Sequence, residues 1–167
     1  MQEGRLIQEV VDFLYHEADL MDEGKWREWL QLMTDDVLYL MPVRVTEERG
    51  KGAGFTTQMT HFHEDRQTLE LRVRRMETDF AWAEDPPSRT RHFVTNIRVF
   101  PTERPNEVRV RSNVLVYRTR GDVPSADLLS AVREDILRKV DGQWRLARRT
   151  VYLDHSVVTT PNLAIFL

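Results

Sequence analysis

Apolar residues recur at helical spacing in the first part of the chain. Between Arg5 and Met21 they return every three or four residues, a pattern that predicts an amphipathic helix. Glu17 falls in the same row, four residues after Phe13 and four before Met21. Its carboxylate should therefore point inward, where it needs a partner. A short second helix should follow, and its apolar side consists of Trp26, Trp29, Leu30 and Met33.

The middle of the chain predicts a strand, a loop and a third helix. The run VLYLMPV, residues 37–43, has the apolar content of a strand, and the glycine-rich residues 46–54 should form a loop. Residues 65–76 return to helical spacing, and Asp65 stands where an N-cap or first-turn acid belongs. Residues 83–90, AEDPPSRT, should form a rigid connector because paired prolines stop regular structure.

From residue 91 onward the chain predicts strands. Alternating patterns cover residues 91–100, 108–120, 127–140 and 143–155, and Asp141–Gly142 should be a hairpin turn between the last two. Helices that precede an antiparallel meander are typical of the α+β class, in which helices pack on one face of a curved sheet. We therefore expect one cone-shaped α+β domain over residues 1–167, with residues 156–167 as a C-terminal tail.

The predicted strands carry charged residues beside apolar neighbours on both faces. A sheet with one face in water usually alternates more cleanly. One interpretation is a solvated outer face with cross-strand ion pairs, and the other is a face that meets another subunit through polar contacts. The charged residues are Arg98, Arg109, Arg111, Arg133, Asp135, Arg148 and Arg149.

Composition fits a soluble globular domain, with 41% hydrophobic and 31% charged residues in a chain of 167. The net charge of −3 and the scattered arginines argue against nucleic-acid binding. No apolar run approaches the ~20 residues that cross a bilayer. The first ten residues, MQEGRLIQEV, lack the apolar core of a signal peptide. We expect a cytoplasmic protein that binds neither membrane nor nucleic acid.

The chain contains no cysteine. This excludes disulfides, thiolate nucleophiles, zinc sites with sulfur ligands and cysteine-ligated iron–sulfur clusters. Only five histidines remain as imidazole ligands for a metal: His16, His61, His63, His92 and His155.

The stretch THFHEDRQ, residues 60–67, resembles a non-haem iron site, which uses two histidines and one carboxylate. On a strand His61 and His63 would share one side, whereas Glu64 would point to the other. Asp65 has suitable spacing but is needed as the helix cap. We therefore interpret the stretch as a strand-to-helix junction, with a metal site and a proton-transfer role as the alternatives, and assign no metal ligand.

Three helices folded into a curved sheet form a cone with a pocket, a layout that resembles ketosteroid isomerase and scytalone dehydratase. Those enzymes perform acid–base chemistry with Asp, Tyr and His side chains inside the cone. A buried His–carboxylate pair can serve as a general base, or the same groups can simply satisfy one another in a core. We assign no catalytic or cofactor-binding residue. The candidates here are Glu17, Asp36, Tyr39, His61 and His92.

Three segments resemble the small (beta) subunit of bacterial aromatic-ring-hydroxylating dioxygenases. They are EADLMDEGKWREWLQLMTDDVLYLMPV, AWAEDPPSRTRHFVTNIRV and RRTVYLDHSVVTTPNLAIFL. The resemblance runs in order over nearly the whole chain, and WAEDPPSRTRH, from Trp82 to His92, is its most specific part.

The resemblance implies a division of labour between two subunits. The large (alpha) subunit holds a Rieske [2Fe–2S] cluster and a mononuclear iron, receives electrons from NADH through a reductase, and adds dioxygen to the ring to give a cis-dihydrodiol. The small subunit has a structural role in a hexamer of three large and three small subunits. The alternative is a free-standing cone-fold isomerase or dehydratase with a His/Asp acid–base pair.

The resemblance also suggests two assembly contacts. Cones that meet around a symmetry axis would bury parts of their sheets, so six charged residues are expected to form contacts between subunits. In the tail, Leu163, Ile165 and Phe166 should pack on this or a neighbouring subunit, and deletion of residues 160–167 should weaken assembly. The six charged residues are Arg98, Arg109, Arg111, Arg133, Asp135 and Arg149.

Overall fold

The structure is a computed structural model that describes residues 2–44, 54–82, 88–155 and 166–167. Its helices are α1 (Gln2–Asp22), α2 (Trp26–Gln31) and α3 (Arg66–Trp82). Its strands are β1 (Met33–Arg44), β2 (Phe55–Glu64), β3 (Ser88–Pro101), β4 (Glu107–Arg120), β5 (Asp127–Val140) and β6 (Gln143–Leu153). The predicted α+β class is confirmed.

The strands described form one six-stranded sheet in the order β2-β1-β6-β5-β4-β3. The meander from β3 to β6 is antiparallel as expected, and Asp141 and Gly142 both have positive φ at its last hairpin. The sheet as a whole is mixed, because β1 pairs in parallel with β6. The antiparallel arrangement expected for the sheet therefore holds for the other strand pairs described and not for β1 with β6. No hairpin joins β1 to β6, because residues 45–142 lie between them in the sequence.

Three element boundaries differ from the sequence prediction. Met33, expected on the second helix, is instead the first residue of β1. Helix α3 continues six residues past position 76, to Trp82. The last three residues of the connector expected at 83–90 belong to β3, which begins at Ser88. Residues at the ends of elements are the least constrained by an apolar pattern.

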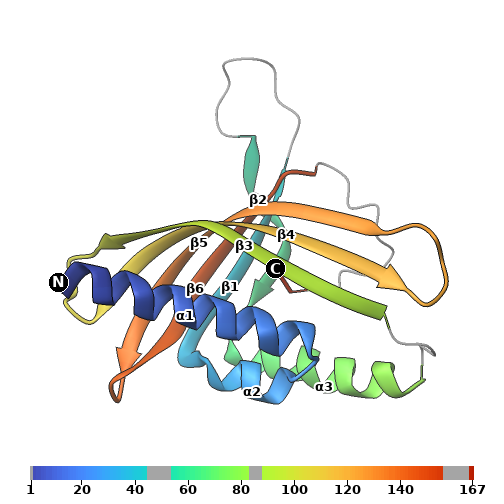
Figure 1. The fold of residues 1–167 in the computed structure, drawn as a ribbon, viewed down its shortest axis with the longest axis horizontal. Helices are drawn as coiled ribbons and strands as arrows, with labels where there is room; N and C mark the ends of the chain where they lie inside the picture. The colour runs from blue at the N-terminus through green and yellow to red at the C-terminus, as the bar shows by residue number, and fades with distance from the viewer. Residues whose placement is uncertain (1, 45–53, 83–87, 156–165) are drawn as a thin grey trace.

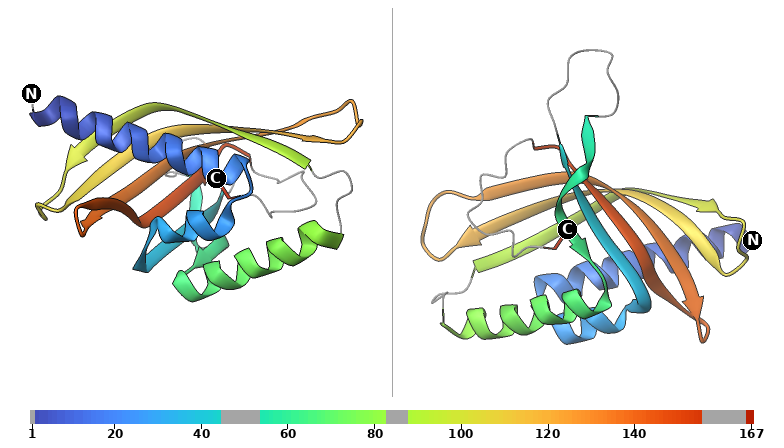
Figure 2. Two further views of the ribbon diagram at one scale, coloured as in Figure 1. Left: turned by 60° about the horizontal axis from the view of Figure 1, so that its bottom comes forward. Right: turned by 180° about the vertical axis from the view of Figure 1, so that it is seen from behind.

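The helices gather on the concave side of the sheet (Figures 1 and 2). Helix α1 packs along the edge strand β3, and α2 and α3 contact each other and β1. Strand β4 shows how the sheet separates its two faces: Val110 and Val114 are buried, whereas Arg109 and Arg111 are exposed. This alternation was expected from the sequence, and it defines a concave inner face and a convex outer face.

A break in the β3–β4 register helps to bend the edge strand. The pairing shifts between Thr95 and Arg98, and Asn96 between them has φ of 54°. A left-handed residue in a bulge re-aims the strand, and asparagine tolerates that conformation better than most residues do. His92 precedes the bulge and faces inward.

Candidate functional site

A charged cluster fills the centre of the inner face. Arg149 on β6 donates to both Glu17 oxygens, with Nη2–Oε1 at 2.7 Å and Nη1–Oε2 at 2.8 Å. It also donates to both oxygens of Asp135, with Nε–Oδ1 at 2.8 Å and Nη2–Oδ2 at 2.9 Å. The indole Nε1 of Trp29 donates to Glu17 at 3.1 Å. All four side chains are essentially excluded from solvent. The expected inward position of Glu17 and its need for a partner are both confirmed.

The cluster fixes the charge of its members. Burial raises the pKa of Glu17, but the charges of Arg149 and Arg133 and the hydrogen bonds it accepts outweigh burial and hold that pKa below its ordinary value. Burial lowers the pKa of Arg149, and the two carboxylates more than reverse this and raise it well above its ordinary value. Glu17 is therefore an ionised, neutralised acid at neutral pH, whereas a general base works best with a pKa near the working pH.

Arg133 is buried beside this cluster with incomplete hydrogen bonding. Its Nε donates to Ser112 at 3.3 Å, and its Nη1 lies 3.8 Å from Glu17 Oε1. Neither Nη1 nor Nη2 has a hydrogen-bond partner within the residues described. Burial, followed by repulsion from Arg149, lowers the pKa of Arg133.

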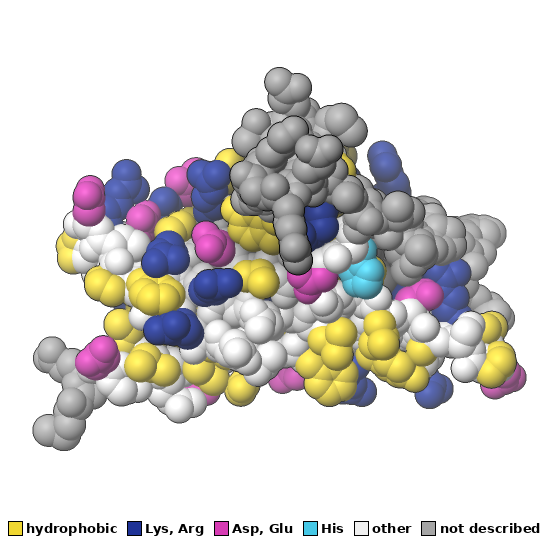
Figure 3. All heavy atoms as spheres, turned by 90° about the horizontal axis from the view of Figure 1, so that it is seen from above, with side chains coloured by type: hydrophobic (Ala, Val, Ile, Leu, Met, Phe, Trp, Pro, Cys, Tyr) yellow, Lys and Arg dark blue, Asp and Glu magenta, His cyan; other side chains and the backbone are white. Residues whose placement is uncertain are grey.

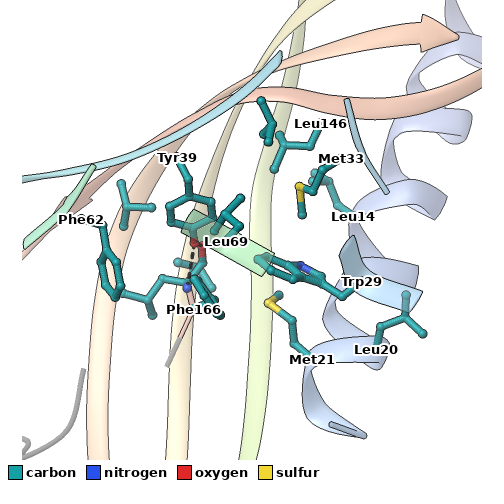
Figure 4. Packing of buried hydrophobic residues seen from close by; sticks show 14 of the residues in the cluster. Leu14, Leu20, Met21, Trp29, Met33, Tyr39, Phe62, Leu69, Leu146 and Phe166 are labelled. Atoms are coloured by element: carbon teal, nitrogen blue, oxygen red, sulfur yellow. Dashed lines mark hydrogen bonds between the residues drawn. The ribbon is translucent and has the colours of Figure 1, made fainter. Parts of the chain in front are cut away.

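Tyr39 lies next to both the cluster and the segment Phe166–Leu167: the Arg149 guanidinium is 5.8 Å from its ring centroid, and Figure 4 shows Tyr39 beside Phe166. Its hydroxyl donates to the main-chain oxygen of Leu167 and accepts from the Leu167 N–H at 3.0 Å. Burial raises the pKa of Tyr39 to about 12. The hydroxyl therefore stays protonated at neutral pH and acts as a hydrogen-bond donor.

His92 on β3 forms the second polar group of the inner face. Its Nδ1 lies 2.5 Å from Asp22 Oδ1, and its main-chain N–H donates to the same carboxylate at 3.0 Å. Its Nε2 lies 2.7 Å from the main-chain oxygen of Phe166, so this nitrogen carries a proton and donates it. A His–Asp pair is present, but its outer nitrogen is already bonded within the chain.

The structure brings Glu17, Tyr39 and His92 together inside the cone and places Asp36 elsewhere. Asp36 is exposed and accepts from Arg138 Nη1 at 2.9 Å. A hydrogen bond from Thr34, followed by the one from Arg138, lowers its pKa. These contacts describe a surface ion pair. The side chain of His61, the fifth candidate, lies outside the described residues.

The stretch at residues 60–67 is a strand-to-helix junction, as expected. Asp65 caps α3: its Oδ1 accepts from the Thr68 N–H at 2.9 Å, and Thr68 Oγ1 accepts from the Asp65 N–H at 2.8 Å. Glu64 is buried and paired with Arg72 Nε at 2.5 Å, and His63 is exposed. In the described part of the chain, no group of three or more His, Asp or Glu side chains is placed to hold a metal.

The structure corrects part of the expected subunit contact. Arg133, Asp135 and Arg149 lie on the inner face, 0%, 1% and 0% exposed, and are therefore enclosed by their own chain. Their assignment to a subunit interface is wrong. Glu17 is the partner that draws the two arginines inward, because a carboxylate buried by a helix needs cations opposite it.

The outer face carries two groups of side chains. Large apolar residues cluster at one end of β3, β4 and β5, where Phe93 pairs with Leu115 and Tyr117 pairs with Leu128. These four residues, here called the outer patch, are 38–54% exposed. Figure 3, which looks onto the sheet from above Figure 1, shows yellow apolar groups among dark-blue cations.

The second group consists of four exposed cations, here called the outer cations. They are Arg98, Arg109, Arg111 and Arg148. Arg98 and Arg111 are directly opposite each other across β3 and β4, and Arg98 and Arg109 both lie over the ring of Phe100, 5.5 Å and 4.2 Å from its centroid. Among the residues with described positions, none of the four forms an ion pair with an acid.

Sequence reasoning missed Asp22 and Leu167 as members of the inner polar groups. Asp22 is the last residue of α1, where the helical pattern ends, and only its distance to His92 reveals its role. Phe166 is 2% exposed, which confirms that it packs in the chain; Leu163 and Ile165 lie outside the described residues. The sequence signals for the cluster are Glu17 in the apolar row of the first helix and the charged positions of β5 and β6 among apolar neighbours.

No helix in the described ranges is long and apolar enough to span a membrane.

Comparison with known proteins identifies the relatives of this arrangement. Residues 16–160 match a family described as the ring hydroxylating beta subunit. A chain of naphthalene 1,2-dioxygenase, solved with indole in the active site, is 29% identical; the match covers 98% of this chain and 86% of that one, with a TM-score of 0.86.

Two further structures share the fold. The beta subunit of benzoate 1,2-dioxygenase from Burkholderia mallei is 22% identical over 87% of this chain and 88% of its own, with a TM-score of 0.73. A protein from Novosphingobium aromaticivorans assigned as a scytalone dehydratase is 18% identical over 93% of this chain and 89% of its own, with a TM-score of 0.66.

Proposed function

Because the chain belongs to the family of ring-hydroxylating dioxygenase beta subunits, which associate with a large alpha subunit, we propose that it is a non-catalytic assembly subunit. The complex it serves cis-dihydroxylates an aromatic compound during its breakdown. Six copies, three large and three small, make up the complex, which resides in the cytoplasm. The single observation that carries the assembly role is the outer face of the sheet, which none of the helices among the described residues covers and where Phe93, Tyr117 and Leu128 are exposed.

The redox centres belong to the large subunit in this proposal. A Rieske cluster needs two cysteines and two histidines, and this chain has no cysteine. Its residues therefore do not fit that cluster. Asp65 and Glu64, the acids nearest to His63 in sequence, are engaged as a helix cap and an ion partner. The mononuclear iron is accordingly assigned to the large subunit as well.

The outer face has the composition of a protein–protein contact. Its outer patch combines Phe93, Leu115, Tyr117 and Leu128, and aromatic side chains are enriched in the buried centres of interfaces. Among the outer cations, Arg98 and Arg111 face each other across β3 and β4, and although Glu134 is opposite Arg111 on β5, no ion pair joins the four cations to an acid in the described chain. An acidic surface on a neighbouring subunit would pair with these cations and fix the orientation of docking.

The inner face supports a non-catalytic role, because its polar groups are already bonded to one another. Glu17 is neutralised by Arg149, Tyr39 has its pKa raised to about 12, and His92 Nε2 is bonded to Phe166. None of these groups is free to exchange protons with a substrate. The rival function, a free-standing isomerase or dehydratase, rests on the shared fold and on one dehydratase-like neighbour that is 18% identical.

Charge reversal tests the assembly role. Arg109→Glu/Arg111→Glu should reduce the yield of hexamer when the chain is co-expressed with its large subunit and the mixture is sized. The matched control is Arg74→Glu/Arg75→Glu, which makes the same change in charge at exposed positions of α3. Equal hexamer yields for the two double variants would contradict a role for the outer cations in docking.

A further inference from the structure

The inner face encloses a segment that belongs to no helix or strand. Phe166 and Leu167 are 2% and 0% exposed. The Phe166 ring lies between four aromatic side chains, with centroid distances of 4.6 Å to Trp29, 5.6 Å to Tyr39, 5.8 Å to Trp26 and 5.9 Å to Phe62. Figure 4 shows the ring among residues of α2, β1 and β2. Aromatic surfaces thus form a ring-sized site on the concave side of the sheet.

The main chain of the same segment is bound by side chains of the sheet. Tyr39 donates to the Leu167 oxygen and Arg149 Nη1 lies 3.4 Å from it, while His92 Nε2 donates to the Phe166 oxygen at 2.7 Å. The Leu167 N–H returns a hydrogen bond to Tyr39. Every hydrogen bond described for these two residues goes to a side chain. The sheet therefore holds the segment as a protein holds a small ligand, and not as part of its own ladder.

The groups that bind the segment are held in place by other partners. Glu17 and Asp135 fix Arg149, and Asp22 fixes His92 through two contacts. Side chains locked in this way keep their positions when an occupant leaves, which is the requirement for a preformed site.

A spare donor lies on the same inner face. Arg133 is wholly buried, and neither Nη1 nor Nη2 makes a hydrogen bond to any residue described. A buried donor without an acceptor is costly, so an occupant that carries an additional acceptor would be favoured over a purely apolar one.

We propose that the inner face is a binding site for a small neutral aromatic compound with a carbonyl group, and that Phe166–Leu167 occupies this site as an internal ligand. The ring takes the place of the Phe166 side chain between Trp29 and Tyr39. The carbonyl oxygen takes the place of the Phe166 or Leu167 oxygen and accepts from His92 or Tyr39. A neutral compound is specified because the hydrogen bonds from His92 and Tyr39 require only an acceptor oxygen and no charge.

Removal of the internal ligand tests the proposal. The probe is 3-phenylpropanamide, which has the ring-to-carbonyl spacing of a phenylalanine residue. A chain that lacks residues 166 and 167 should bind the probe saturably in calorimetry and shift the indole N–H resonance of Trp29, with at least tenfold higher affinity than the full chain. The hydrocarbon n-propylbenzene, which has the ring without the carbonyl, should bind the shortened chain more weakly.

A second variant guards against loss of folding. Phe166→Ala keeps the main-chain contacts of the segment and removes only the ring, so it should admit benzene into the gap. In the shortened chain, Tyr39→Phe should weaken binding of 3-phenylpropanamide roughly fivefold, the effect of one net hydrogen bond. Phe93→Ala, on the outer face, should leave the affinity of the full chain for 3-phenylpropanamide and benzene unchanged.

Two results would overturn the proposal. If the shortened chain and Phe166→Ala fold but bind no probe, the site has no capacity for a ligand. If both variants unfold, Phe166–Leu167 is an obligatory part of the core and not a replaceable occupant. Neither result bears on the assembly role, because these assays measure small-molecule binding by the single chain, whereas the assembly test measures hexamer formation.

Discussion

Arg149 and Glu17 lie 132 positions apart in the sequence and form a two-pronged ion pair in the centre of the inner face, at 2.7 and 2.8 Å. The pair ties the first helix to the last strand. Asp135 accepts hydrogen bonds from Nε and Nη2 of the same guanidinium. A buried charge network of this kind is costly to break one member at a time, because the remaining charges are left without partners.

Substitution of Arg149 should therefore reduce stability strongly. Arg149→Met removes the cation shared by Glu17 and Asp135 and should lower the free energy of unfolding by about 3–5 kcal/mol. The neighbouring Arg148→Met is the control, since Arg148 is exposed on the outer face. Urea unfolding followed by tryptophan fluorescence measures both. Equal midpoints for the two variants would show that the network contributes little.

The stability of the chain should decrease as the pH decreases, because Glu17 becomes protonated. The pKa of Glu17 in the folded chain lies below its ordinary value of 4.5, so the unfolded chain takes up the proton first. The contribution of Glu17 is fully present above pH 4.5 and is lost as the pH falls toward the folded pKa. The difference in unfolding free energy between wild type and Glu17→Gln should shrink from pH 6 to pH 3.

Glu28→Gln provides the control for this pH series. Glu28 is exposed on α2, so the difference in unfolding free energy between wild type and Glu28→Gln should stay small at every pH. A Glu17→Gln difference that is constant from pH 6 to pH 3 would contradict the assigned direction of the Glu17 pKa shift.

Phe166 and Phe93 form a matched pair of aromatic residues on opposite faces of the sheet. Phe166→Ala leaves a gap among Trp29, Tyr39 and Phe62 and should cost about 3–5 kcal/mol of unfolding free energy. Phe93 is 53% exposed, so Phe93→Ala should change the unfolding free energy of the chain alone by less than about 0.5 kcal/mol. In the complex, Phe93→Ala should weaken subunit association, because Phe93 belongs to the proposed docking face. Comparable losses in the isolated chain would argue that Phe93 is already covered.

Asp65 should act as a helix cap and not as a metal ligand. Asp65→Ala removes the acceptor of the Thr68 N–H and should lower the melting temperature, by less than Arg149→Met does. The metal content of the purified chain should not respond to the substitution. A loss of bound metal in Asp65→Ala would reopen the iron interpretation of the residues around His63.

The sequence was informative where spacing alone decides an outcome. The helical row that contains Glu17 predicted a buried carboxylate, and the position of Asp65 at a helix start predicted the cap. Valines at alternate positions of β4 predicted one apolar face of that strand, and the structure shows that this face is the inner one. Each of these inferences needs only neighbours within a few residues, which is the range over which periodicity determines the direction of a side chain.

The charged residues of β5 and β6 could not be placed by the same reasoning. In β5 the inner face carries Arg133 and Asp135 beside Leu137, and the outer face carries Glu134 beside Ile136. Both faces of β5 carry charged and apolar residues, so the hydropathy pattern does not distinguish the inner face from the outer one. Only the approach of Glu17 from α1 makes the inner position of the two charges favourable.

Long-range pairings were equally beyond local patterns. The parallel contact between β1 and β6 joins strands that are about a hundred residues apart, and no turn connects them. The His92–Asp22 pair likewise depends on how α1 lies along β3, which is a property of the assembled fold.

Iron analysis of the separated subunits tests the division of labour most directly. The small chain, purified alone and reconstituted with ferrous iron and sulfide, should retain no stoichiometric iron and should not oxidise an aromatic substrate. Addition of the large subunit should yield a complex that contains iron and turns over with an electron donor. Stoichiometric iron held by the small chain, or turnover by that chain without its companion, would contradict the account.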